Sequence, residues 1–188
     1  MDQTTLKHEA AERAVTYITD GMIVGLGTGS TSQLMIAALG VRVAAGLRIR
    51  GVATSEHSAE QARSLGIEVL QLDDVKRIDL TIDGADEIDL ANFGLIKGGG
   101  GALLREKIVA RASNMEIIIA DVSKLVPRLG QHMPIPVEVI PFGWRHTAAR
   151  LTDLGCTPHL RPAATGDTPY LTDGGHYILD CACEPLAD

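Results

Sequence analysis

The sequence predicts an α/β fold: a parallel sheet covered by helices on both faces, followed by a smaller α+β lobe. Short apolar strands alternate with amphipathic helices over residues 4–120, which is the pattern that parallel sheets produce. The apolar side chains are mostly Ala, Val, Ile and Leu, and aromatic residues make up only 3% of the chain. This composition is typical of strands that are buried on both faces of a sheet.

The alternation predicts the elements of the sheet in turn. Thr4 or Thr5 is expected to cap a first helix that ends near residue 20. Ser30 or Thr31 is expected to cap a second helix that runs to about residue 39. Further helices are predicted at 56–65 and 102–113, and strands at 22–26, 47–53, 67–70, 78–82 and 116–120.

The chain changes character at residues 127–141, which contain four prolines. We therefore place a boundary near residue 130, between a first domain at 1–130 and a small α+β lobe at 131–188. The lobe is predicted to contain a helix at 144–154 and strands at 137–140, 157–160 and 177–181. We expect the lobe to be incomplete, because residues 185–188 are typical of the beginning of a helix.

Composition and charge exclude several classes of protein. The 188 residues fit one domain, or one main domain with a small appendage. The net charge is −7 and Lys and Arg do not cluster, so we expect no nucleic-acid partner. The chain has neither a signal segment nor an apolar run long enough to span a bilayer, so we expect a cytoplasmic protein without a membrane partner.

The cysteines and histidines indicate neither a disulfide framework nor a metal site. Two of the three cysteines, Cys181 and Cys183, are two residues apart, which fits neither a zinc site nor a redox motif. We expect all three to be reduced thiols, as in the cytosol. The six histidines are scattered without a ligand pattern, so we expect no bound metal.

A glycine-rich turn at residues 25–31 leaves a predicted strand and opens a predicted helix. Glycines let the backbone approach a ligand closely, and the unpaired N–H groups of a helix N-terminus attract anions. With the hydroxyls of Ser30 and Thr31, the turn is typical of a phosphate cradle. It matches neither a P-loop nor the dinucleotide fingerprint, which favours a small phosphorylated ligand. A tight strand-to-helix turn without a ligand is the alternative.

Three carboxylates, Asp83, Asp86 and Glu87, follow the strand predicted at 78–82. Ligands of open α/β sheets bind at the carboxyl ends of the strands, so this position indicates function. A solvated turn or a divalent-cation site would give the same pattern.

Four consecutive glycines, residues 98–101, follow Lys97. They suggest backbone that lies against a ligand, with Lys97 as a cation beside it. Glu106 lies one turn into the next helix, and its spacing alone favours an ordinary exposed residue. Lys124 is either a surface lysine or a charge at the end of a central strand.

Five motifs occur together and in order. They are IVGLGTGST at 23–31, IDGADE at 82–87, IKGGGGA at 96–102 with REK at 105–107, IADVSK at 119–124, and PVEVIP at 136–141. In sequence and spacing they closely resemble the type A ribose-5-phosphate isomerase family, and the resemblance runs from about Lys7 to Asp180.

The resemblance implies a Rossmann-like, three-layer α/β/α sheet with a small α+β lobe, assembled as a homodimer or homotetramer. It implies reversible conversion of D-ribose 5-phosphate to D-ribulose 5-phosphate through an enediolate, in the non-oxidative pentose phosphate pathway. No metal or organic cofactor is implied, and the one partner is a small sugar phosphate.

The resemblance also implies roles for individual residues. Glu106 would be the base that moves the proton. Asp83, Asp86 and Lys97 would hold the sugar hydroxyls, assist ring opening and stabilise the oxyanion. The substrate-binding residues implied are Lys7, Thr28, Gly29, Ser30, Thr31, Asp83, Gly84, Ala85, Asp86, Lys97, Gly98, Gly99, Gly100 and Lys124.

Three alternatives compete with the isomerase. A sugar-phosphate sensor would keep the phosphate turn without the base, whereas Glu106 and Lys97 are both present. An amino-sugar phosphate deaminase needs a histidine in the site, and a coenzyme A transferase needs a much larger chain. Members of the family usually continue for a few dozen residues more, so a folded but inactive truncation product is the third alternative.

Overall fold

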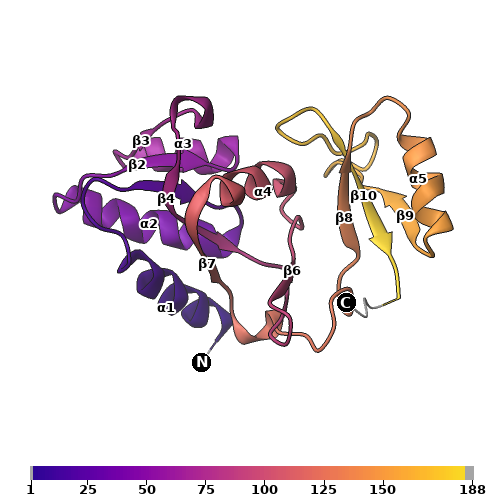
Figure 1. Ribbon diagram of the computed structural model, residues 1–188, viewed down its shortest axis with the longest axis horizontal. Helices are drawn as coiled ribbons and strands as arrows, with labels where there is room; N and C mark the ends of the chain where they lie inside the picture. Colours follow the sequence, from indigo (N-terminus) through magenta and orange to yellow (C-terminus); the bar gives the residue numbers. More distant parts are fainter. Residues whose placement is uncertain (1, 185–188) are drawn as a thin grey trace. The chain divides into compact units, whose positions relative to one another are not determined.

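The computed structural model describes residues 2–184 of the chain, which form two compact units (Figure 1). The first unit comprises Met1–Gly84 and Leu104–Val122, and the second comprises Ala85–Leu103 and Ser123–Asp188. The two units therefore interleave along the chain. Whether residues 1–130 and 131–188 also fold as separate domains stays a prediction.

The first unit contains a five-stranded parallel sheet, as the sequence predicts. Its strands are β1 (Ile23–Leu26), β2 (Arg50–Ala53), β3 (Glu68–Val69), β4 (Ile78–Gly84) and β7 (Ser113–Ile119). They lie in the order β3-β2-β1-β4-β7, and every neighbouring pair is parallel. The strand order reverses between β1 and β4, which is where open sheets of this kind form a crevice for ligands.

Helices cover both faces of this sheet, which confirms the three-layer prediction. The helices α1 (Gln3–Val15) and α2 (Ser30–Ala44) pack on the face that carries Val24 and Leu26. Gly25, between these two residues, points to the other face, where a Cβ would lie 2.9 Å from Val109 of α4. The other two helices beside this sheet are α3 (Glu56–Ser64) and α4 (Leu103–Arg111).

Three predicted boundaries, in two helices, are wrong. The cap of α1 is Asp2, whose Oδ1 accepts from the Thr5 N–H at 2.8 Å, so neither threonine is the cap, and the helix ends at Val15. The second helix runs to Ala44 because Gly40 does not stop it. Gly40 is buried, and a Cβ there would lie 2.9 Å from Leu65, so this glycine permits close packing of the helix.

The second unit contains an antiparallel sheet of three strands. Its strands are β8 (Ile135–Val139), β9 (Thr157–Leu160) and β10 (Tyr177–Ala182), in the order β8-β10-β9. Helix α5 (Trp144–Asp153) packs on it through Trp144, Ala148 and Leu151. These elements agree with the prediction for the small lobe. The helix start expected at residues 185–188 lies outside the described residues.

A short hairpin and two 3-10 turns complete the described chain. The hairpin pairs β5 (Glu87–Asp89) with β6 (Gly94–Ile96) in antiparallel register, and the sequence analysis did not predict it. The turns are η1 (Leu72–Asp74) and η2 (Val122–Lys124).

The expectation of three reduced thiols is wrong for two of them. Cys156 and Cys183 form a disulfide, and only Cys181 keeps its thiol. The pairing follows from the register of β9 and β10, in which Thr157 lies opposite Ala182, so the cysteines just beyond these residues face each other. Burial raises the pKa of the Cys181 thiol above its usual value.

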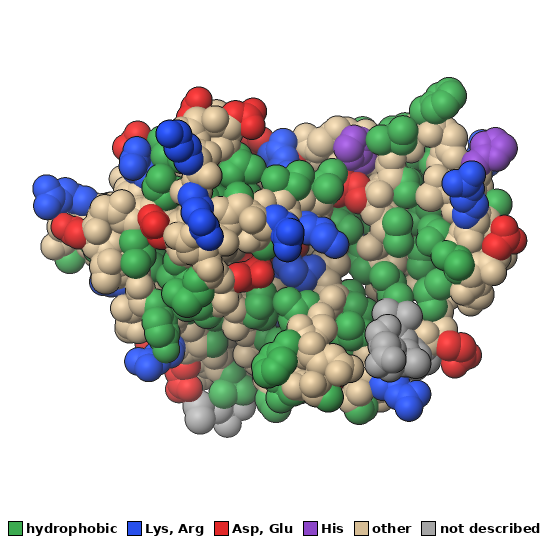
Figure 2. Space-filling model, viewed as in Figure 1, with side chains coloured by type: hydrophobic (Ala, Val, Ile, Leu, Met, Phe, Trp, Pro, Cys, Tyr) green, Lys and Arg blue, Asp and Glu red, His purple; other side chains and the backbone are tan. Residues whose placement is uncertain are grey.

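The surface charge and the helices are the features relevant to a nucleic-acid or membrane partner. On the face drawn in Figure 2, basic and acidic side chains are interspersed over the first unit. Among residues 2–184, no helix combines the length and the apolar character that crossing a bilayer requires.

Candidate functional site

The glycine-rich turn after β1 lies directly against the end of β4. A Cβ on Gly27 would come within 2.2 Å of Asp83 Oδ1 and 2.6 Å of the Asp83 Cα, so no larger residue fits there. Gly29 has a φ of 111°, which glycine adopts readily and other residues do not. The turn therefore requires glycine at both positions, for two different reasons.

Asp83 holds this turn in place. The residue is 1% exposed, and its Oδ1 accepts from the Thr28 N–H at 3.1 Å, the Gly84 N–H at 2.7 Å and the Ser32 hydroxyl at 3.3 Å. Hydrogen bonds to an ionised acceptor are stronger than neutral ones. The carboxylate thus joins the end of β4 to the turn after β1, at the point where the strand order reverses.

A cluster of hydroxyl groups holds the Thr28 side chain. Thr28 Oγ1 lies 2.7 Å from Thr54 Oγ1, 2.8 Å from Ser55 Oγ and 3.3 Å from Ser58 Oγ. These partners come from the end of β2 and the beginning of α3. The sequence analysis missed them, although the polar Thr54 and Ser55 directly after a predicted strand are a usable signal.

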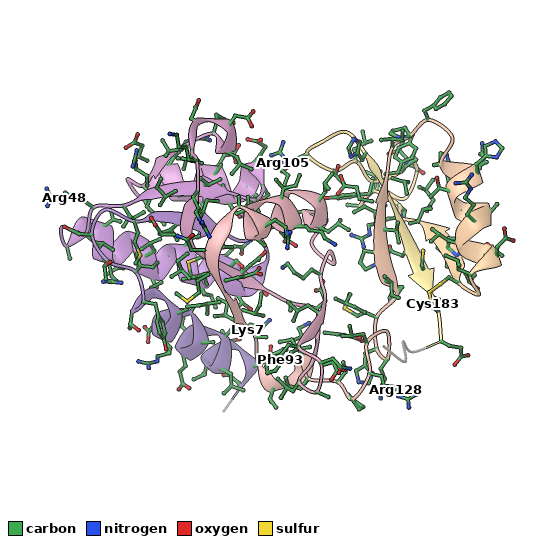
Figure 3. All side chains as sticks on the ribbon, viewed as in Figure 1. Lys7, Arg48, Phe93, Arg105, Arg128 and Cys183 are labelled. Atoms are coloured by element: carbon green, nitrogen blue, oxygen red, sulfur yellow. A yellow bond between two sulfur atoms is a disulfide. The ribbon has the colours of Figure 1, made fainter. Side chains whose placement is uncertain are left out.

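Lys7 and Ser30 meet at the N-terminus of α2. Lys7 Nζ, on α1, lies 3.2 Å from Ser30 Oγ (Figure 3). The N-cap of α2 is Gly29, which makes no side-chain cap hydrogen bond, so the predicted cap by Ser30 or Thr31 is wrong. Unpaired N–H groups, a hydroxyl and an ammonium group together favour an anion at this position.

Glu106 lies in the first turn of α4 and is 4% exposed. The expectation from spacing alone, that Glu106 is an ordinary exposed helix residue, is therefore wrong. The positive end of the helix dipole stabilises a carboxylate in this first turn. Next to it, Arg105 donates to Glu56 at 2.8 Å and lowers the pKa of the Glu56 carboxyl (Figure 3).

Asp86, Lys97 and the four glycines belong to the second unit. The Asp86 N–H donates to the Ile96 carbonyl at 2.8 Å, and Asp86 Oδ2 accepts from the Gly99 N–H at 2.7 Å. Lys97 directly follows β6 and is half-buried. The hairpin therefore brings Asp86 to the glycine turn that begins after Lys97.

The protein's own side chains explain three of the four glycines. A Cβ on Gly98 would lie 3.0 Å from Leu103 and 3.1 Å from Pro136. A Cβ on Gly99 would lie 2.7 Å from Asp86 Oδ1, and one on Gly101 would lie 2.3 Å from the Tyr170 hydroxyl. Packing within the protein, together with positive φ values at Gly98 and Gly101, thus favours these glycines, whether or not a ligand lies against them.

Glu87, the third carboxylate of the acidic motif, has a structural partner of its own. It is 1% exposed, and its two oxygens accept from the N–H groups of Gly130 at 2.6 Å, His132 at 2.6 Å and Met133 at 3.0 Å. The carboxylate therefore holds the segment that leads into β8. The sequence places Glu87 among the carboxylates at a functional strand end, but its structural role was not predicted, because these partners lie more than 40 residues away in the chain.

The predicted site residues divide between the two units. The first unit holds Lys7, Thr28, Gly29, Ser30, Thr31, Asp83, Gly84 and Glu106, and the second holds Ala85, Asp86, Lys97, Gly98, Gly99, Gly100 and Lys124. In the first unit, contacts join Lys7 to Ser30 and Thr28 to Asp83. In the second, Asp86 contacts Gly99 and Lys124 ends η2. Within residues 2–184, no three His, Cys, Asp or Glu side chains are grouped as metal ligands.

The parallel sheet, its helices on both faces and the glycine turn at the reversal of strand order define a Rossmann-like α/β protein. The family model of ribose 5-phosphate isomerase A (phosphoriboisomerase A) matches residues 50–188. The chain is 56% identical over 187 residues to ribose-5-phosphate isomerase A of Gloeobacter violaceus, covering 100% of this chain and 80% of that protein. This chain belongs to the ribose 5-phosphate isomerase A family, as its motifs predict.

Solved structures agree with this assignment. A D-ribose-5-phosphate isomerase in complex with phospho-erythronic acid superposes with a TM-score of 0.96 at 39% identity, covering 100% of this chain and 82% of that one. The ribose 5-phosphate isomerase of Methanocaldococcus jannaschii superposes with a TM-score of 0.95 at 38% identity, covering 100% of this chain and 83% of that one.

Proposed function

We propose that this chain interconverts D-ribose 5-phosphate and D-ribulose 5-phosphate through an enediolate, as an aldose–ketose isomerase of the non-oxidative pentose phosphate pathway. Membership of the family supports the reaction. A relative bound to phospho-erythronic acid supports a phosphorylated sugar derivative as the ligand class. The observation that carries the proposal is the buried carboxylate of Glu106 in the first turn of α4.

In the proposed mechanism Glu106 is the base. It takes the proton from C2 of the open-chain aldose, and the electron pair of that bond forms the enediolate. The proton returns to C1 while the hydroxyl proton moves from O2 to O1, which gives the ketose. Burial shields the transferred proton from exchange with water. A positioned base of this kind typically contributes about 10²–10⁴-fold to the rate. Because the electron pair never leaves the substrate and the proton is returned to it, the proposed reaction needs no redox cofactor, and no metal is invoked.

The other charged groups assist this transfer. Lys97 supplies a positive charge for the developing oxyanion, an effect that is often the larger catalytic term. Asp83 and Asp86 hold the sugar hydroxyls and assist ring opening. The backbone around them, at Gly84, Ala85 and residues 98–100, contacts the substrate.

The phosphate end of the substrate lies at the N-terminus of α2 in this proposal. The contact between Lys7 Nζ and Ser30 Oγ supports it, because it joins a cation to a hydroxyl at the start of a helix. Thr28, Gly29 and Thr31 complete the turn, and Lys124 adds a second cation. In this proposal the protein acts in the cytoplasm and assembles as a homodimer or homotetramer. Light scattering of the purified chain tests the size of the assembly.

The first test is an assay of the purified chain with ribose 5-phosphate in the presence of EDTA. We expect turnover, and we expect Glu106→Gln to lower kcat by about 100-fold or more while substrate binding survives. Glu68→Gln, an exposed carboxylate in β3, is the matched control and should leave kcat unchanged. Binding without turnover in a folded wild-type chain would instead indicate a sugar-phosphate sensor.

A further inference from the structure

Arg161 joins the antiparallel sheet of the second unit to its glycine turn. The residue follows β9, and its Nε and Nη2 donate to the two carboxylate oxygens of Asp180 in β10, at 2.9 and 2.5 Å. The two side chains are 16% and 22% exposed. A bidentate pair between the residue after β9 and a residue of β10 gives the guanidinium one fixed orientation.

The remaining nitrogen of this guanidinium contacts the glycine turn. Arg161 Nη1 donates to the carbonyl oxygen of Gly98 at 2.9 Å and to that of Gly99 at 3.2 Å. The N–H of the Gly98–Gly99 peptide donates to Asp86 Oδ2 at 2.7 Å. The described residues contain no cis peptide bond, so the C=O and N–H of this peptide point in opposite directions. Arg161 and Asp86 therefore hold the same peptide from its two ends.

Packing confines the turn further. The Arg161 guanidinium lies 5.9 Å from the centre of the Tyr170 ring, whose hydroxyl leaves no room for a Cβ on Gly101. The Tyr170 N–H donates to the Arg161 carbonyl at 2.8 Å, so both side chains start from one paired stretch of backbone. Without such contacts, a run of glycines would have more conformational freedom than any other sequence.

We propose that Arg161, oriented by Asp180, is a positioning residue for the isomerisation, and this proposal rests on the function proposed above. Lys97 directly precedes the peptide that Arg161 and Asp86 hold, so the orientation of this peptide limits where the ammonium group reaches. Arg161 acts on the reacting atoms only through Lys97 and Asp86. A displacement of about 1 Å in such groups costs on the order of 100-fold in rate. Loss of the Arg161 contacts therefore lowers kcat.

The decisive variant is Arg161→Lys, which keeps a cation for Asp180 but has one nitrogen where the planar guanidinium uses three, so the bonds to Asp180 and to the Gly98 carbonyl cannot all keep their geometry. We expect kcat to fall by about 10-fold or more, with KM within about twofold, because Arg161 makes none of the proposed phosphate contacts. The control is Arg48→Lys, which changes the Arg48–Asp20 pair. The Arg48 side chain is 87% exposed. Arg48 is labelled in Figure 3. Kinetic constants within twofold of wild type are expected for it.

A second readout separates positioning from general loss of structure. Amide hydrogen exchange of residues 97–101 should accelerate in Arg161→Lys while exchange in β8 and β10 stays at the wild-type rate. In Arg161→Ala, millimolar guanidinium should restore part of kcat by occupying the vacated position beside Asp180. The same salt should not restore Glu106→Gln.

Three results overturn the proposal. They are a folded Arg161→Lys with wild-type kcat, a loss of kcat with faster exchange throughout the second unit, and an Arg161→Ala that guanidinium does not restore. In each case a wild-type chain that still turns over ribose 5-phosphate leaves the isomerase function standing. A folded wild-type chain without turnover overturns the isomerase function itself, and the positioning role falls with it.

Discussion

The two glycine turns differ in where their support comes from. The turn after β1 rests on Asp83, which ends the neighbouring strand of the same sheet. The turn after β6 rests on Asp86 nearby and on Arg161, which is 63 residues from Gly98 in the chain. A turn supported by regular structure depends on its own sheet, whereas the second turn depends on the correct folding of a separate sheet.

The largest expected effect tests the support of the first turn. Gly27→Ala places a Cβ 2.6 Å from the Cα of Asp83, and backbone atoms cannot move aside cheaply. We expect the free energy of unfolding to fall by about 3 kcal/mol or more, measured by urea denaturation.

The control for this prediction is Gly21→Ala. Gly21 has a φ of 84°, and apart from its chain neighbours no heavy atom of the described residues lies within 4 Å of its added Cβ. Only backbone strain should result, costing about 1–2 kcal/mol. Equal losses in the two variants would mean that the close approach to Asp83 contributes nothing.

Glu87→Gln tests the support of the second unit. A glutamine offers one acceptor oxygen where the carboxylate accepts three N–H groups with two. We expect a loss of about 2 kcal/mol in the free energy of unfolding. Glu68→Gln, which changes an exposed carboxylate, should cost less than about 0.5 kcal/mol. A Glu87 variant as stable as this control would contradict the role of its buried carboxylate.

Replacing the hydroxyls of the first turn distinguishes the two turns by kinetics. With Ser30 and Thr31 both changed to Ala, we expect KM for ribose 5-phosphate to rise by about 10-fold and kcat to change little, because hydrogen bonds to the phosphate are lost. Ser64→Ala in α3 is the control. An unchanged KM would remove the phosphate from this turn, whereas the Arg161 variants should change kcat instead.

The smallest effect concerns the Arg105–Glu56 pair of the first unit. The Arg105 hydrogen bond lowers the pKa of Glu56 in the folded state. The pair therefore stabilises the fold at pH values above 4.5, the ordinary pKa of a glutamate. Its side chains are 40% and 62% exposed, so Arg105→Gln should cost less than about 1 kcal/mol at pH 7. The difference from wild type should vanish as the pH falls below 4.5. A difference that persists in acid would point to lost packing instead of lost charge.

The sequence predicts the regular first unit better than the second. Apolar runs such as residues 78–82 identify buried strands. The position of Asp83 at a strand end could therefore be predicted, because a polar residue directly after an apolar run is visible in the sequence. The strands β5 and β6 have three residues each, too few for a periodic signal. The pairing of Arg161 with Asp180 depends on strand register, which single-sequence patterns do not give.

The burial of Glu106 shows the same limit within one helix. Spacing places it on α4, but which side of the helix faces the protein depends on how α4 packs against Gly25 and Thr81. The disulfide of Cys156 and Cys183 was likewise hidden, because it follows from the pairing of β9 with β10. In both cases tertiary packing decides what the local pattern leaves open.

The segment at residues 83–87 has a consequence for how this protein can change over generations. Only Ala85 and Asp86 separate the end of β4 from the beginning of β5, and carboxylates in this stretch serve three different loops. Side chains of a strand alternate between faces, so one inserted codon there would turn the residues after it to the opposite side. At least one loop would then lose its carboxylate, although no core residue had been replaced. This stretch should accept substitutions at Ala85 far more readily than any change in its length.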